Sequence, residues 1–317
     1  MGEPAVSAQG LTKCFGAVCA CQGIDLTVAP GEIVGLVGPD GAGKTTAFRM
    51  LCGILPPDHG TARVAGYDVV TQSEAVKARI GYLPQRFSLH RDLTIDENIQ
   101  YVAELYTVPR DEWQSRREEL LEMTYLAPFR RRLAGRLSGG MRQKLALVCA
   151  LVHRPEVLFL DEPTTGVDPV SRRDFWKLLH DLPRQGVTMV ISTPYMDEAA
   201  RCNRLAFMYA GQVLATDTPD NLRRQLPGEL MQVRCRPQRE AREALKRCSA
   251  VRSVEVFGDR LHVLFHGTAD PMLCERLLAD AGVECLEQQP VEPSLEDVFM
   301  SLVSEHGLTA TATGNGL

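Results

Sequence analysis

The chain has 317 residues and a net charge of −5, and 44% of its residues are hydrophobic. This composition is typical of a folded globular protein and excludes global disorder. An acidic chain lacks the positive charge that collects phosphate backbones, so we expect no nucleic-acid partner. Nucleotide binding stays open because it needs only local hydrogen-bond donors.

The sequence offers no sign of a membrane span or a secretory signal. Its best apolar run, residues 145–152, is far shorter than 18 residues, and the start MGEPAVSAQG has no apolar core. The ten cysteines lack metal or redox spacing. We therefore expect a cytosolic chain with reduced cysteines.

Residues 1–225 alternate apolar runs with helical patterns, which predicts an α/β domain with a largely parallel sheet. Buried strands are predicted over 32–37, 156–160 and 187–192. A mostly helical subdomain is predicted over about 89–153. It opens with Thr94 and Glu97 in capping-box spacing.

A glycine-rich loop follows the first of these strands and fits the pattern GxxxxGK[ST]. Its backbone N–H groups would face phosphate oxygens, Lys44 would bridge the β- and γ-phosphates, and Thr45 would bind Mg²⁺. The alternative is a strand-to-helix turn with a chance Lys-Thr pair. The predicted nucleotide-binding residues are Gly38, Pro39, Asp40, Gly41, Ala42, Gly43, Lys44, Thr45 and Thr46.

A second anion-binding element lies at Leu137-Ser138-Gly139-Gly140-Met141, before an amphipathic helix. A serine hydroxyl and glycine amides at a helix N-terminus can bind phosphate. Taken alone, this stretch would be an ordinary helix cap. Its position between the phosphate loop and a pair of acids favours the functional interpretation.

The pair of acids, Asp161 and Glu162, ends the strand at 156–160. The carboxyl edge of a parallel sheet is where ligands of such domains bind. We expect Asp161 to hold Mg²⁺ and Glu162 to accept the proton of an attacking water. Adjacent acids at a strand end can also be loop residues without a function.

Residues 226–306 show shorter elements in the order βαββαβ, with a turn at Gly258-Asp259. This order predicts a small α+β, ferredoxin-like domain. We expect residues 307–317 to form a flexible tail.

These motifs resemble the ATP-binding cassette (ABC) ATPases, a class of P-loop NTPase, over about the first 225 residues. The resemblance implies that Ser138, Gly139 and Gly140 close over ATP held by a second cassette. It implies that Gln85 senses Mg²⁺ and the attacking water and that Phe15 stacks on adenine. It also places 166–169 at the seam of the pair.

The pattern breaks at Pro194, where the family has a histidine that contacts the γ-phosphate. Proline has neither a side-chain donor nor an N–H. Loss of one such donor typically lowers the rate by about 10²–10³. We expect ATP to be bound well but cleaved slowly at this site, the alternative being that Glu162 alone sustains turnover.

The whole chain is most similar to bacterial ABC-2-type drug-exporter ATPases, especially the first half of tandem subunits. The stretches KLALVCALV, STPYMDEA and SLEDVFMSLV carry this resemblance. It implies ATP-driven efflux with an integral-membrane permease, a second cassette, and a peripheral place on the cytoplasmic face of the plasma membrane. The permease would dock at 86–99. The alternatives are a mechanical ATPase on ribosomes or DNA and a non-hydrolysing regulatory module.

Overall fold

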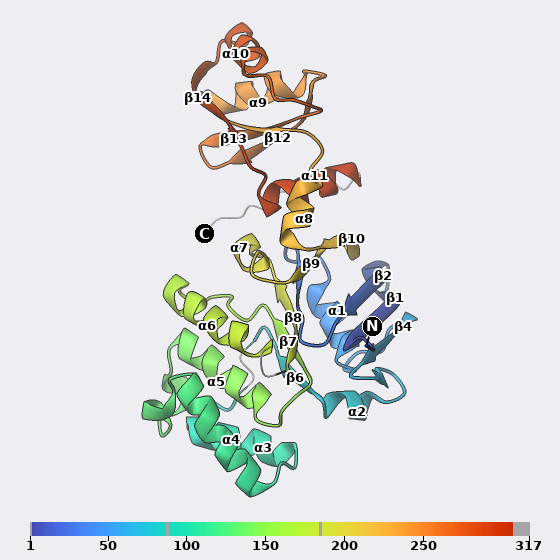
Figure 1. The fold of residues 1–317 in the computed structure, drawn as a ribbon, viewed down its shortest axis with the longest axis vertical. Coiled ribbons are helices and arrows are strands. Elements are labelled where there is room, and N and C mark those ends of the chain that lie inside the picture. The colour runs from blue at the N-terminus through green and yellow to red at the C-terminus, as the bar shows by residue number, and fades with distance from the viewer. Residues whose placement is uncertain (1, 87–88, 184–185, 307–317) are drawn as a thin grey trace. The chain divides into compact units, whose positions relative to one another are not determined.

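The computed structural model describes residues 2–86, 89–183 and 186–306 (Figure 1). The chain divides into two compact units, Met1–Thr216 and Asp217–Leu317. Among the described helices, none combines the length and apolar composition needed to cross a bilayer.

A six-stranded sheet forms the centre of the first unit, and it orders its strands β10-β9-β3-β8-β7-β6. Five of these strands run parallel, which confirms the predicted parallel sheet. β3, β7 and β8 are buried along their whole length, as their apolar sequences require. The strands are β3 (Ile33–Val37), β6 (Ile80–Leu83), β7 (Val157–Asp161), β8 (Thr188–Thr193), β9 (Arg204–Tyr209) and β10 (Gln212–Asp217).

A second sheet of four strands, ordered β2-β1-β4-β5, is antiparallel and was not expected from the sequence. Its strands are β1 (Val6–Phe15), β2 (Val18–Val28), β4 (His59–Val64) and β5 (Tyr67–Asp68). Cys14 and Cys19, paired across β1 and β2, form a disulfide. The expectation that all cysteines are reduced is therefore wrong for this pair, because the two cysteines lie directly opposite each other on neighbouring strands.

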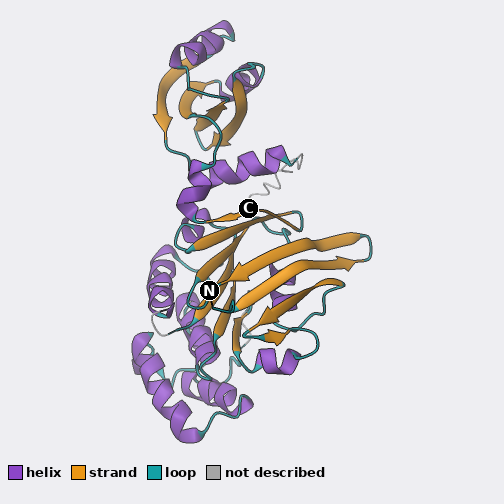
Figure 2. Ribbon diagram, turned by 45° about the vertical axis from the view of Figure 1, so that its right-hand side comes forward, coloured by secondary structure: helices purple, strands orange, loops and turns teal. Residues whose placement is uncertain are grey.

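Helices flank both sheets (Figure 2). α1 (Lys44–Leu51) contacts strands of both sheets, and α2 (Ser73–Lys77) packs near β5 and β6. The helices α3 to α6 lie on the other side of the six-stranded sheet from the four-stranded one (Figure 1). The remaining helical segments that the structure describes in this unit are α3 (Ile95–Leu105), α4 (Arg110–Met123), η1 (Ala127–Phe129), η2 (Ala134–Arg136), α5 (Gly139–Leu151), α6 (Pro169–Asp181) and α7 (Met196–Ala199).

Two predicted helix starts are confirmed. Thr94 caps α3 in a reciprocal capping box with Glu97. Ser138 caps α5 by accepting a hydrogen bond from the Met141 N–H. The capping box fixes the entry into the helical subdomain, and the Ser138 cap fixes the second anion-binding element.

The second unit has the predicted βαββαβ order, with an antiparallel sheet ordered β12-β13-β11-β14. α9 and α10 pack against this sheet over a core that includes Val233, Leu245 and Phe265. This is the ferredoxin-like arrangement expected from the sequence. The elements are α8 (Pro219–Arg224), β11 (Leu230–Arg236), α9 (Gln238–Lys246), β12 (Val251–Phe257), β13 (Arg260–Phe265), α10 (Pro271–Asp280), β14 (Glu284–Val291) and α11 (Leu295–Glu305).

Candidate nucleotide-binding site

The glycine-rich loop connects β3 to α1, and two of its glycines are required by the backbone. A Cβ at Gly38 would overlap the carbonyl oxygen of Met208. Gly43 has a φ of 101°, in the left-handed region, and immediately precedes α1. The loop can therefore curl tightly between β3 and α1, as a phosphate-binding loop must.

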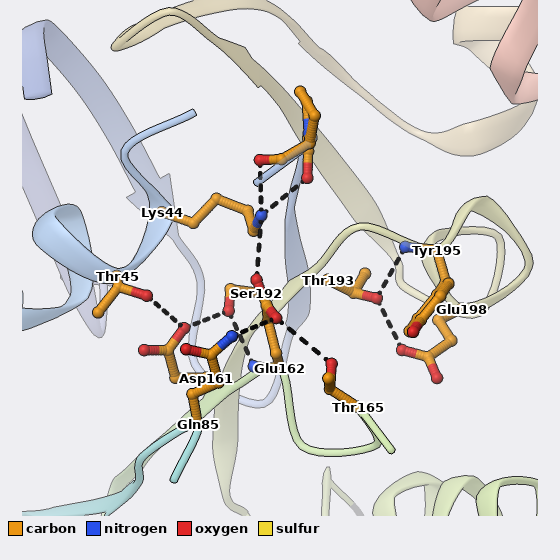
Figure 3. A network of polar contacts seen from close by, with 12 residues as sticks. Lys44, Thr45, Gln85, Asp161, Glu162, Thr165, Ser192, Thr193, Tyr195 and Glu198 are labelled. Carbon is orange, nitrogen blue, oxygen red and sulfur yellow. Dashed lines mark hydrogen bonds and ion pairs between the residues drawn. The ribbon is translucent and has the colours of Figure 1, made fainter. Parts of the chain in front are cut away.

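Lys44 is almost fully buried, with 3% of its surface exposed. Its Nζ donates to the carbonyl oxygens of Gly38 and Pro39 at 2.8 and 2.9 Å. The same Nζ lies 3.1 Å from Glu162 Oε1, so the two predicted catalytic residues form a buried ion pair (Figure 3). The ammonium group is thus held by two carbonyl oxygens of its own loop.

Asp161 ends β7, and its carboxylate is fully buried. Its Oδ1 accepts from Ser192 Oγ at 2.6 Å and from Thr45 Oγ1 at 3.2 Å. The Tyr82 hydroxyl lies 3.5 Å from the other oxygen. Burial, and then the negative charge of Asp161, raise the pKa of Tyr82, so this phenol stays protonated beside the carboxylate.

Glu162 has a φ of 48°, a left-handed backbone conformation that is rare for a residue with a side chain. Its N–H donates to Ser192 Oγ at 3.0 Å and to the Ser192 carbonyl oxygen at 3.1 Å. Its Oε2 accepts from Gln85 Nε2 at 2.8 Å and from Thr165 Oγ1 at 3.3 Å. A strained backbone at a chemically competent carboxylate is typical of a functional site.

The oxygen donors around Asp161 fit a magnesium ion. Thr45 Oγ1 and Asp161 Oδ1 already lie within hydrogen-bond distance, and hydroxyl and carboxylate oxygens are preferred magnesium ligands. Within the described ranges, no group of three or more His, Cys, Asp or Glu residues is placed to hold a metal. A site with two protein ligands leaves the remaining positions to phosphate and water, as Mg²⁺ commonly requires. Gln85, also predicted as a ligand, contacts Glu162 in this structure.

A cavity of about 370 Å³ opens at the loop, and Lys44, Thr45, Gln85 and Glu162 line it together. It brings together predicted phosphate-binding, metal-binding and catalytic residues, and Asp161, which does not line it, is hydrogen-bonded to Thr45. Phe15 is not one of the lining residues. It lies exposed at the end of β1, while Ala20 of the paired strand β2 reaches the cavity wall. The complete lining is Ala20, Asp40, Gly41, Gly43, Lys44, Thr45, Thr46, Gln85 and Glu162.

The second anion-binding element does not join this cavity. Ser138 is exposed at the start of α5, and Gly139 follows half-buried. Gly140 is buried, and a Cβ there would collide with the Ser171 side chain of α6. Asp168 caps α6 by accepting from the Val170 and Ser171 N–H groups. Bonds from Ser171 lower the pKa of this carboxyl.

Pro194 follows directly after β8, whose Ser192 lies opposite Asp161 in the parallel register. The residues around it are Thr193, whose hydroxyl accepts from the Tyr195 N–H, and Tyr195 itself. Neither Pro194 nor its backbone can donate a hydrogen bond.

Sequence reasoning missed Ser192 and Glu198. Ser192 lies opposite Asp161 in the parallel register, and it binds both acids. Its place at the end of a predicted neighbouring strand was the available signal. Glu198 is buried and accepts a hydrogen bond from Thr193 Oγ1. No local sequence pattern predicts this contact.

Comparisons with known proteins find relatives for both parts of the chain. The family description "ABC transporter" matches residues 21–165, and "ATP-binding protein DrrA1-3-like, C-terminal domain" matches 218–303. The probable multidrug ABC transporter ATP-binding protein YbhF of Escherichia coli is 37% identical over 99% of this chain. The chain spans only 54% of that relative's length.

The daunorubicin resistance ATP-binding protein DrrA3 of Streptomyces coeruleorubidus is 36% identical over 96% of this chain and 98% of its own length. The structure of the cassette MJ0796, described as a dimeric post-hydrolysis state bound to ADP and Pi, superposes with a TM-score of 0.61. It is 26% identical, and the match covers 67% of this chain and 98% of that one. This chain, with its phosphate loop, acid pair and separate serine-glycine element, therefore belongs to the ATP-binding proteins of the ABC transporter family.

Proposed function

We propose that this chain binds and hydrolyses ATP and so powers an ABC-2-type exporter of drugs or other xenobiotics. The observation that carries the proposal is the convergence of Lys44, Thr45 and Glu162 at one cavity, with Asp161 hydrogen-bonded to Thr45. Phosphoryl transfer to water needs a phosphate-binding loop, a metal-binding group and a base, and this site has all three.

The contacts of Lys44 indicate how binding prepares the base. Lys44 Nζ is shared between two loop carbonyls and Glu162 Oε1. Phosphate oxygens compete with the carboxylate for this ammonium group, because both are anions in a buried setting. Engagement of Lys44 by ATP then releases Glu162 Oε1 to accept a proton, while Gln85 holds Oε2. Mg²⁺, held by Thr45 and Asp161, would neutralise charge on the phosphates.

The site of this chain is completed by a second cassette. Ser138 is exposed, Gly139 is half-buried, and both lie outside the Lys44 cavity, so they are available to ATP held elsewhere. The relative MJ0796, described as a dimer with ADP and Pi, supports a paired arrangement. In our proposal, Ser138 completes the partner's site and the partner's equivalent completes this one.

The chain's own site is weakened. Pro194 stands where a histidine would donate to developing charge, and a single lost donor lowers the rate by about 10²–10³. ATP bound at Lys44 then serves mainly to hold the two cassettes together, and ATP is hydrolysed faster at the partner's site. A purely regulatory module is the limiting case of this proposal.

Single-turnover hydrolysis with the second cassette present tests the weakened site. We expect Pro194→His to raise the rate by about 10²-fold or more. Pro194→Ala is the matched control, because it adds the same backbone N–H as Pro194→His but no side-chain donor, and it should leave the rate unchanged. An unchanged rate in Pro194→His, or an equal gain in Pro194→Ala, contradicts the missing donor as the cause.

Export through an integral-membrane permease is proposed from the relatives, which are named for multidrug transport and daunorubicin resistance. The proposed docking surface spans 86–99, of which Phe87 and Ser88 lie outside the described residues. The chain would then sit on the cytoplasmic face of the plasma membrane. In vesicles that contain the permease, a drug substrate should stimulate hydrolysis. Co-purification with ribosomal RNA instead would favour a mechanical ATPase.

A further inference from the structure

Glu198 is a buried carboxylate that the proposed mechanism does not use. It lies in the short helix α7, and 1% of its surface is exposed. A buried charge needs hydrogen bonds or an ion pair to offset the lost hydration. Its partners therefore show which parts of the site it joins.

Two threonines on separate segments donate to this one carboxylate. Thr193 Oγ1 donates to Oε2 at 2.7 Å (Figure 3), and Thr164 Oγ1 donates to Oε1. The Arg172 Nε of α6 lies 3.6 Å from Oε1. The Arg172 guanidinium also stacks over the Tyr195 ring at 4.4 Å.

Thr164 belongs to the segment that leaves the catalytic acid. It lies two residues after Glu162, and its carbonyl accepts from the Val167 N–H in the turn that leads to Asp168. Asp168 then caps α6. A displacement of Thr164 would therefore move both Glu162 and the start of α6.

Thr193 belongs to the segment that carries Pro194. Its hydroxyl accepts from the Tyr195 N–H at 3.1 Å, and its carbonyl accepts from the Gly38 N–H of the phosphate loop at 3.3 Å. Thr193 therefore links residue 194 to the loop that holds phosphate.

We propose that Glu198 is a positioning residue that holds segment 193–195 and segment 162–168 in one fixed relation. Because each carboxylate oxygen serves a different segment, loss of either threonine hydroxyl breaks the link between them. The link sets where residue 194 stands relative to Glu162, and it passes a displacement of the Asp168 turn to the phosphate loop. The catalytic part of this inference rests on the proposed function, whereas the mechanical part does not.

The test uses Thr164→Val and Thr193→Val, which keep the side-chain shape and remove one hydroxyl each. Thr188→Val is the matched control, because Thr188 is a buried threonine of the same strand β8 that accepts from the Gly31 N–H. Glu198→Gln keeps the shape of the carboxylate and part of its hydrogen bonding.

We expect each of the two threonine variants to lower single-turnover hydrolysis about tenfold, since small misplacements at an active site are costly. ATP affinity should change less than about twofold. The double variant should lose no more than either single variant, because one break already opens the link. Glu198→Gln should retain more activity than Glu198→Ala. Rate losses that simply follow melting temperature, with Thr188→Val behaving alike, would overturn the proposal.

Hydrogen exchange gives a second readout that needs no hydrolysis. In Thr164→Val, the peptide covering 193–199 should exchange faster, although Thr164 lies on another segment. In Thr188→Val it should exchange as in the parent chain. An unchanged peptide in Thr164→Val refutes the link. If the parent chain hydrolyses no ATP, but Thr164→Val still exchanges faster than the parent, the result contradicts the proposed function and leaves the link standing.

Discussion

At the scale of single residues, the ion pair between Lys44 and Glu162 is the central feature of the site. Both side chains are buried, so each lowers the free-energy penalty of burying the other. The motif residues could be predicted from the sequence because a glycine loop and an acid pair are local patterns. Their pairing could not, because it depends on the parallel neighbours β3, β8 and β7.

Replacing the base tests its role. Glu162→Gln keeps the shape and the Gln85 contact, but it removes the proton acceptor and the charge beside Lys44. We expect hydrolysis to fall by about 10²–10⁴-fold, with ATP bound as tightly or more tightly because Lys44 no longer faces a competing carboxylate. Rapid-quench kinetics and equilibrium binding of ATP measure the two quantities. Weaker binding together with unchanged hydrolysis would show that Glu162 serves only to hold Lys44.

At the scale of elements, strands with continuous apolar sequences and helices with polar caps were predicted well. β7, β8 and the capped starts of α3 and α5 follow from runs and spacings of a few residues. The four-stranded antiparallel sheet was missed because its pairing is set over distance. β1 pairs with β4 across some fifty residues of sequence, and neither strand has a run of buried side chains.

α11 of the second unit depends on a buried polar pair. His262 Nδ1 lies 2.7 Å from Asp297 Oδ1, and Asp297 also closes a capping box with Ser294. Burial alone would raise the pKa of Asp297, but His262 and Ser294 outweigh it and lower the pKa below its ordinary value of 3.8.

This lowered pKa predicts an acid-sensitive second unit. A depressed carboxyl pKa contributes stability that is present above the unfolded-state value and is lost as the pH falls through the folded-state value. Asp297→Asn should therefore lower the melting temperature at pH 7, and its deficit should shrink towards pH 3. Calorimetry of the full chain measures both, with the exposed Asp259→Asn as control. A deficit that is constant with pH would contradict the assignment.

At the scale of the whole molecule, the boundary between the two parts is a proposal with a physical test. The sequence favours a boundary near 225, whereas the compact units meet at Thr216 and Asp217. The difference is α8, which contacts α11 and buries Leu222 completely. Composition shifts mark the change of pattern after Pro227, but they do not reveal which core a short helix joins.

Two fragments of the second unit distinguish these boundaries. A fragment covering 217–306 keeps the contact between α8 and α11, and one covering 226–306 loses it. We expect the shorter fragment to be less stable by at least about 2 kcal/mol, the order of one buried leucine. Urea unfolding followed by circular dichroism gives the comparison. Equal midpoints would contradict the assignment of α8 to the second unit.

The close approach of Gly140 to Ser171 has a consequence for assembly. α5 and α6 pack directly against each other there, because Gly140 has no side chain to separate them. The exposed Ser138 and the Asp168 turn therefore stand on one stiff corner of the chain. In the pair of cassettes proposed above, we therefore expect both to reach the neighbouring cassette together rather than one edge at a time.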